Sequence, residues 1–134
     1  MSMFSIFGVS GSAVSAQSQR LNVVASNLAN ADAVAGPDGQ GYKARQVVFQ
    51  TMLTAQGSSG VQVSTVVEND TPGRRVHDPK HPAADAEGYV TYSNVNAVEE
   101  MVNMISASRS YQNNVEVMNT ARSLIAKTLQ LGQG

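Results

Sequence analysis

Apolar residues recur at helical spacing at both ends of the chain and follow a different pattern between them. In the first stretch, from about residue 4 to residue 31, the recurring residues are Phe7, Val14, Leu21, Val24 and Leu28. A repeat of three, four or seven positions places such residues on one side of an α-helix. Ser12 is a candidate N-cap, and Gly8 and Gly11 weaken the turns before it. We therefore expect a firm helix from Ser12 and helical turns before it only where they are packed.

A longer helix is predicted for residues 95–131. Its apolar stripe, close to heptad spacing, consists of Val98, Met101, Val102, Ile105, Tyr111, Val115, Met118, Ile125 and Leu129. Asn96 followed by Glu99 resembles a capping box, Lys127 is expected in the last turn, and Gly132 is expected to end the helix. Such a helix is about 50 Å long.

The middle of the chain changes to a pattern of short extended segments and turns. Segments rich in β-branched residues, predicted to be strands of one small sheet, lie at residues 42–49, 61–67 and 88–92. A turn cluster precedes them at residues 36–41, and a loop with two prolines occupies residues 78–82. The middle is therefore predicted to be a small β-rich insert with much loop.

The lengths of these elements predict the architecture. A helix of about 50 Å is too long for a small insert to cover, and its only long partner in the chain is the N-terminal helix. We expect a mainly α fold with a small β insert, in which the long terminal helices pair as a coiled-coil hairpin. The segments are residues 1–35, 36–94 and 95–134, and the two helices form one core domain.

Composition indicates a surface that faces other protein. Charged residues make up 14% of the chain, and Arg20 is the only one before Asp32. A typical soluble domain carries roughly 25% charged residues. The net charge of −1, without a basic run, argues against nucleic-acid binding, and the absence of cysteine excludes disulfides and thiolate metal sites.

Two helices leave part of each apolar stripe uncovered, so we predict packing against neighbouring copies or homologues. The residues expected in the helix-packing interface are Val14, Leu21, Val24, Asn27, Leu28, Asn30, Val98, Met101, Ile105, Tyr111, Val115, Met118, Ile125 and Leu129. Two interpretations of Asn27 and Asn30 stay open. Their amides either cap a helix end or form hydrogen bonds between helices that fix the register.

No catalytic, cofactor-binding or metal site is predicted, and no small-molecule substrate. His77 and His81 have the spacing of a helical metal site, but Pro79 and Pro82 prevent a regular helix there. A small hydrolase would need a nucleophile and base, and no such set stands out.

Membrane insertion is not expected either. No stretch approaches the roughly 20 apolar residues of a membrane span. Phe4, Ile6 and Phe7 could insert into a membrane surface, but interfacial helices carry several Lys or Arg residues and this helix has only Arg20. The first residues also lack the features of a cleaved secretory signal.

Several segments carry a resemblance to a known family. Residues 26–32, which read Ser-Asn-Leu-Ala-Asn-Ala-Asp, and residues 11–25 before them resemble the Asn-rich signature of bacterial flagellar axial proteins, the rod, hook and hook-associated subunits. Residues 94–121 and 129–132 are similar to the C-terminal helix of the proximal-rod members. The middle also resembles those members, at residues 36–39, 47–49, 77–82 and 84–90.

The resemblance implies a structural subunit that assembles with itself and with homologous rod subunits. It also implies neighbours at the membrane-ring side, where an adapter binds, and in the distal rod. The resemblance further implies export without cleavage through the flagellar type III apparatus, assembly in the periplasm, and a hollow rod that transmits torque.

Overall fold

The computed structural model describes residues 2–55 and 57–133. Two helices lie at the ends of the chain, α1 (Met3–Ala29) and α2 (Ala97–Gln133). Between them lie two antiparallel pairs of strands, β1 (Arg45–Leu53) with β2 (Ser59–Glu68), and β3 (Arg75–His77) with β4 (Tyr89–Thr91). The predicted fold class, paired terminal helices with a small β insert, is confirmed.

Helix α1 begins nine residues before the predicted N-cap. Ser2 is the actual cap, because its Oγ accepts a hydrogen bond from the Ser5 amide at 3.1 Å. Ser12 therefore lies inside the helix. Its Oγ donates to the Val9 carbonyl at 2.7 Å and accepts from the Val61 amide of β2 at 3.1 Å. The prediction of Ser12 as a cap was wrong, and its hydroxyl instead ties α1 to the strand pair.

Helix α2 begins as predicted and ends later. The Oδ1 of Asn96 accepts from the Glu99 amide at 3.2 Å, which is an N-cap. Gly132 was expected to end the helix, but the helix continues to Gln133, and Lys127 is therefore not in the last turn. Gly132 has open space around it and does not adopt the left-handed backbone that ends helices at glycine.

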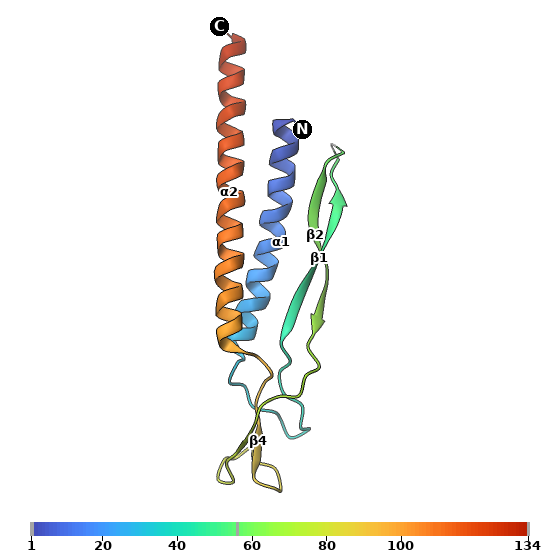
Figure 1. The fold of residues 1–134 in the computed structure, drawn as a ribbon, viewed down its shortest axis with the longest axis vertical. Coiled ribbons are helices and arrows are strands. Elements are labelled where there is room, and N and C mark those ends of the chain that lie inside the picture. The colour runs from blue at the N-terminus through green and yellow to red at the C-terminus, as the bar shows by residue number, and fades with distance from the viewer. Residues whose placement is uncertain (1, 56, 134) are drawn as a thin grey trace.

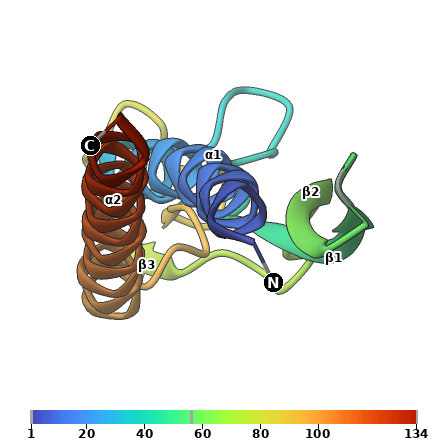
Figure 2. The same ribbon diagram turned by 90° about the horizontal axis from the view of Figure 1, so that it is seen from above.

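The two helices lie side by side and antiparallel, so both ends of the chain lie at the same end of the molecule (Figure 1). Seen from above, α1 lies between α2 and the β1–β2 pair (Figure 2). Helix α2, with 37 residues, is the longer, and it runs on past the start of α1. Helix α1 is therefore covered on two sides, and helix α2 mainly on one.

The strands form two separate sheets, not the one small sheet that was predicted. The β1–β2 hairpin turns at Gly57, whose φ of 79° is in the left-handed region that glycine favours. Its face with Gly60 approaches α1 closely, since a Cβ on Gly60 would lie 2.7 Å from Ser12 Oγ. Packing against a helix stabilises a hairpin that would be marginal alone.

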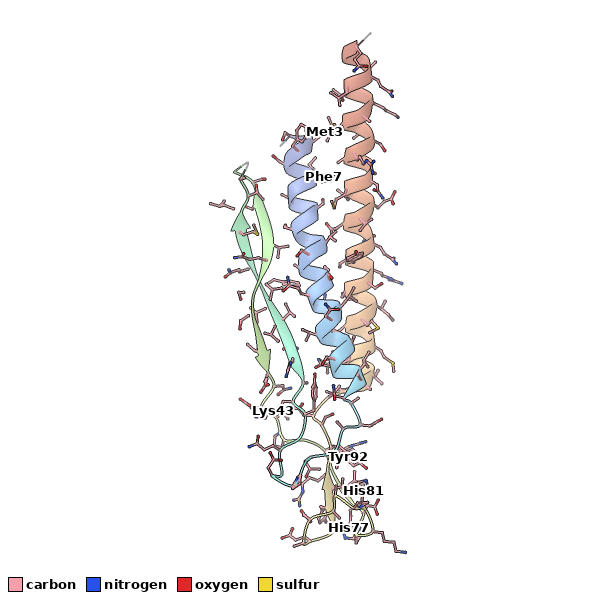
Figure 3. All side chains as sticks on the ribbon, turned by 180° about the vertical axis from the view of Figure 1, so that it is seen from behind. Met3, Phe7, Lys43, His77, His81 and Tyr92 are labelled. Carbon is pink, nitrogen blue, oxygen red and sulfur yellow. The ribbon has the colours of Figure 1, made fainter. Side chains whose placement is uncertain are left out.

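The β3–β4 pair and its loops form a tip below the helices, where His77 and His81 lie (Figure 3). Asp85 holds this tip together. Its Oδ1 accepts from the Glu87 and Tyr89 amides, both at 2.9 Å, and its Oδ2 accepts from Arg75 at 3.0 Å. The hydrogen bond from the Tyr89 amide is the main cause that lowers the pKa of Asp85, with smaller contributions from the Glu87 amide and Arg75.

Candidate assembly interface

Asn27, near the end of α1, is fully buried and uses its whole carboxamide. Its Oδ1 accepts from the Arg45 amide at 3.0 Å and from the Tyr42 hydroxyl at 2.8 Å. Its Nδ2 donates to the Arg45 carbonyl at 2.8 Å and to Glu100 Oε2 at 3.1 Å. One side chain thus joins α1, the segment before β1, the first residue of β1 and the first turn of α2.

Asn94, just before α2, makes a second set of hydrogen bonds that join segments distant in the sequence. Its Oδ1 accepts from the Ala44 amide at 2.6 Å, and its Nδ2 donates to the Asn69 and Thr71 carbonyls at 2.7 and 2.8 Å. These bonds hold the residue before β1 and the residues after β2 beside the start of α2. We call Asn27, Tyr42, Arg45, Asn94 and Glu100 the junction. It fixes where the hairpin and both helices meet.

The two asparagines of the N-terminal signature have different roles. Asn27 bonds to α2 through Glu100, as in the interhelical interpretation. Asn30 is the C-cap of α1: its backbone amide points at the carbonyls of Ser26 and Asn27, and its Nδ2 donates to the Ser26 carbonyl at 2.8 Å. The interhelical hydrogen bond is therefore made by Asn27, and the helix end is capped by Asn30.

The remaining α1 residues of the predicted interface are buried or half-buried. Val24 is buried, and the half-buried ones are Val14, Leu21 and Leu28. Gly11, on the same helix, faces α2, since a Cβ there would lie 3.8 Å from the terminal carbon of Met118. Small residues let the two helix backbones approach closely.

The predicted stripe of α2 is divided between two sides of the helix. Half-buried on the side toward α1 lie Tyr111, Val115, Met118 and Ile125. The other five residues of the predicted stripe are exposed in the single chain: Val98, Met101, Val102, Ile105 and Leu129. The buried residues of α2 are Glu100, Ala107 and Ala121, and Val98 is roughly half a helical turn away from Ala107.

Four residues near the start of α2 form a continuous exposed apolar surface, which we call the start stripe: Val98, Met101, Val102 and Ile105. The side chains of Val98 and Ile105 are 70% and 55% exposed. Exposed apolar surface of this kind, on the side of a helix away from its partner, is typical of a protein interface.

A groove of about 460 Å³ lies between the start of α1 and the second half of α2. Its apolar lining, which we call the end groove, is Met3, Ile6, Val117, Ala121 and Leu124. Because Met3 lies beside Ala121 and Leu124, the residues of α2 that follow lie beyond the start of α1. This explains why Leu129, on the predicted stripe, is 64% exposed.

The tip offers no arrangement that resembles a metal or catalytic site. The His77 ring packs edge to face on Tyr89, with ring centroids 5.0 Å apart, and His81 Nδ1 accepts from the Ala83 amide at 3.0 Å. Across residues 2–55 and 57–133, His, Asp and Glu side chains form no group of three that could hold a metal ion. In the same residues, neither helix is both long and apolar enough to span a membrane.

Sequence reasoning missed Tyr42, Arg45, Asn94 and Glu100 as members of the junction. Tyr42 was placed in a predicted strand. One signal was available: Asn94 and Asn27 each lie next to a helix end, where polar side chains commonly bond to the backbone of a neighbouring segment. Their partners are separated from them by many residues, which no local pattern reveals.

Long paired terminal helices that leave apolar surface on their outer side are typical of a class of protein whose helices pack against the helices of further chains. Comparisons with known sequences identify the class. The family described as "Flagella basal body rod protein" matches residues 7–37, and the one described as "Flagellar basal body rod FlgEFG protein C-terminal" matches residues 86–131.

Full-length relatives extend the match to the whole chain. Flagellar basal-body rod protein FlgC of Salmonella typhimurium is 57% identical over 134 residues, covering 99% of this chain and 100% of the relative. The protein of that name from Escherichia coli O157:H7 is 58% identical with the same coverage, and the one from Buchnera aphidicola of Acyrthosiphon pisum is 47% identical over 137 residues. The chain belongs to the FlgC family of flagellar basal-body rod proteins.

Proposed function

We propose that this chain is a structural subunit of the rod of a bacterial flagellar basal body, in its proximal part, and has no catalytic role. The observation that carries the proposal is the start stripe of α2. Its four apolar side chains are between 54% and 70% exposed in the single chain, so they are free to pack against another chain. Family membership supports the rod as the assembly in which this occurs.

The partners we propose are other copies of the chain, homologous rod subunits, an adapter at the membrane-ring side and the distal rod. In this arrangement the helix pairs lie side by side around a hollow shaft, which transmits torque and supports motility. The chain reaches the periplasm uncleaved through the flagellar type III apparatus. The helices supply the contacts, and the junction fixes their mutual register.

A deletion strain tests the proposal. Removing the gene should abolish hooks and filaments, and expressing the wild-type chain from a plasmid should restore them. Electron microscopy of purified basal bodies from the restored strain should show density for the helix pair within the rod. Hooks formed at the normal frequency in the deletion strain would contradict the proposal.

A further inference from the structure

The β1–β2 hairpin has strand edges that lack the usual protection. An edge strand presents backbone N–H and C=O groups that can pair with another chain, and proteins commonly protect such edges with short strands, charged residues or proline. The β3–β4 pair fits this rule, because its strands have three residues each and β3 begins with Arg75. Between Arg45 and Glu68, by contrast, no residue is charged and none is proline. The long hairpin is interrupted only by the irregularity after Val48.

The hydrogen bonds to α1 show which backbone groups of the hairpin point outward. The Val61 amide donates to Ser12 Oγ at 3.1 Å, so this amide points away from β1. Thr51 lies opposite Val61 in the ladder, and in an antiparallel pair two opposite residues direct their amides and carbonyls either toward each other or both outward. The amide and carbonyl of Thr51 therefore point away from β2. The same holds for Phe49 and Leu53, because the direction alternates along a strand.

Helix α1 occupies part of these outward groups and leaves the rest free. Ser12 takes the Val61 amide near the turn, and Asn27 takes the amide and carbonyl of Arg45 at the start of β1. The two strands cross, so that near the turn β2 lies toward α1 and β1 lies on the far side (Figure 1). On that far side, no side chain or loop of residues 2–55 and 57–133 bonds to the outward groups of residues 49–53, which we call the open edge.

We propose that the open edge pairs with an extended, uncharged segment of a different rod subunit, which adds a third strand to the hairpin on the outer side of β1. The inference rests on the proposed function and names a contact outside the helices. In strand addition the backbone hydrogen bonds supply the affinity, and the side chains on alternate positions supply the specificity. Leu53, whose side chain is 76% exposed, is the apolar residue that such a segment would cover. An uncharged segment suits an edge that offers no opposite charge to pair with.

A second copy of the chain does not fit the open edge. Pairing of β1 with β1 is two-fold symmetric, whereas neighbours around a hollow shaft meet through two different surfaces. The other edge of the hairpin, that of β2, is bonded to Ser12 near the turn and finishes at the charged Glu68. The segment that pairs with the open edge therefore comes from a different chain.

A proline at residue 51 tests the pairing in the cell. Thr51→Pro removes one outward amide and leaves the ladder to β2 intact. With protein at the wild-type level, we expect the number of hooks per cell to fall about two- to tenfold, the range for one lost hydrogen bond. The matched control is Val66→Pro, which removes an outward amide from β2, since Val66 lies opposite Val47, and should leave the hook count unchanged. Wild-type hook counts for Thr51→Pro would overturn the pairing, whereas hooks in a strain without the gene would instead reject the proposed function.

Hydrogen exchange on the wild-type chain gives a test that does not depend on the folding of a variant. In the isolated chain the outward Thr51 amide should exchange fast, and the neighbouring Gln50 amide, which points toward β2, should exchange slowly. In purified basal bodies the Thr51 amide should become as slow as that of Gln50. A Thr51 amide that stays fast in basal bodies would overturn the pairing.

A cross-link identifies the segment that lies on the open edge. Benzoylphenylalanine incorporated at residue 53 and activated by light in purified basal bodies should join the chain to a different rod protein. Mass spectrometry of the linked peptides should place the link in an uncharged, extended segment of that protein. Links between two copies of this chain, or links to a helix, would overturn the proposed strand addition.

Discussion

At the junction, where α1 ends and α2 begins, buried polar groups find their partners within the chain. Along the outer side of α2, by contrast, apolar side chains find none. Asn27 is fully buried with four hydrogen bonds, while Val98, two residues before its partner Glu100, is 70% exposed. At the junction the polar groups are satisfied within the subunit, whereas on the outer side of α2 the burial of apolar side chains is left to the assembly. The difference separates the residues that should control folding from those that should control association.

The largest effect should come from placing a charge on the start stripe. Ile105→Asp leaves the isolated chain folded, because residue 105 is exposed there, but in an assembly the carboxylate is buried without a partner at a cost of several kcal/mol. Every subunit repeats this cost, so we expect protein at the wild-type level and no hooks. Immunoblots and electron microscopy check this, and normal hooks would contradict the role of the stripe.

Removing the central side chain of the junction should instead act on the single chain. Asn27→Ala leaves the amide and carbonyl of Arg45 and the carboxylate of Glu100 without their buried partner. We expect the free energy of unfolding to fall by about 2–4 kcal/mol in urea titrations of the isolated protein. A matched control is Asn30→Ala, which removes only a cap bond and should cost about 0.5–1 kcal/mol. Equal losses for the two variants would contradict the assignment.

Part of the contrast between the junction and the outer side of α2 could be predicted from the sequence, and part could not. The helices follow from periodicity, because residues three, four and seven apart share one side of a helix, and their pairing follows from their lengths. The division of the α2 stripe between two sides was not predicted. Arg45 and Glu100 could not be predicted, because their contacts with Asn27 join residues 18 and 73 positions apart. Ser12 was misjudged because its hydroxyl bonds to the Val9 carbonyl within the helix and to the Val61 amide of β2. Gly132 was misjudged because glycine is disfavoured in a helix but not excluded from it.

The tip gives a smaller, pH-dependent effect. Because the pKa of Asp85 is lowered in the folded chain, its contribution to stability is present above the ordinary pKa of about 3.9 and is lost as the pH falls through the lowered value. We expect the protection of the Tyr89 amide against hydrogen exchange, relative to its intrinsic exchange rate, to fall in acid, with the junction unaffected. Asp85→Asn should remove this pH dependence of the protection. An unchanged acid response in that variant would assign it to another group.

The smallest effect should come from the histidines of the tip. Replacing His77 and His81 together by Ala removes one aromatic contact at an exposed position and one hydrogen bond at a half-buried one. Surface changes of this kind usually alter stability by about 0.5 kcal/mol or less. Swimming speed and the heat of Zn²⁺ titration should equal those of the wild type. A micromolar zinc affinity that disappears in the variant would show that the tip does bind metal.

The pairing of the first helix with the last has a consequence for the order of folding. The β1–β2 hairpin closes a short loop and can form early, whereas the bond between Asn27 and Glu100 must close a loop of 73 residues. Contacts that distant in sequence form late and slow the rate of folding. A chain that is still emerging or still extended therefore holds no completed helix pair. Its end groove, which needs Met3 and Leu124 side by side, comes into existence only when the whole subunit has folded.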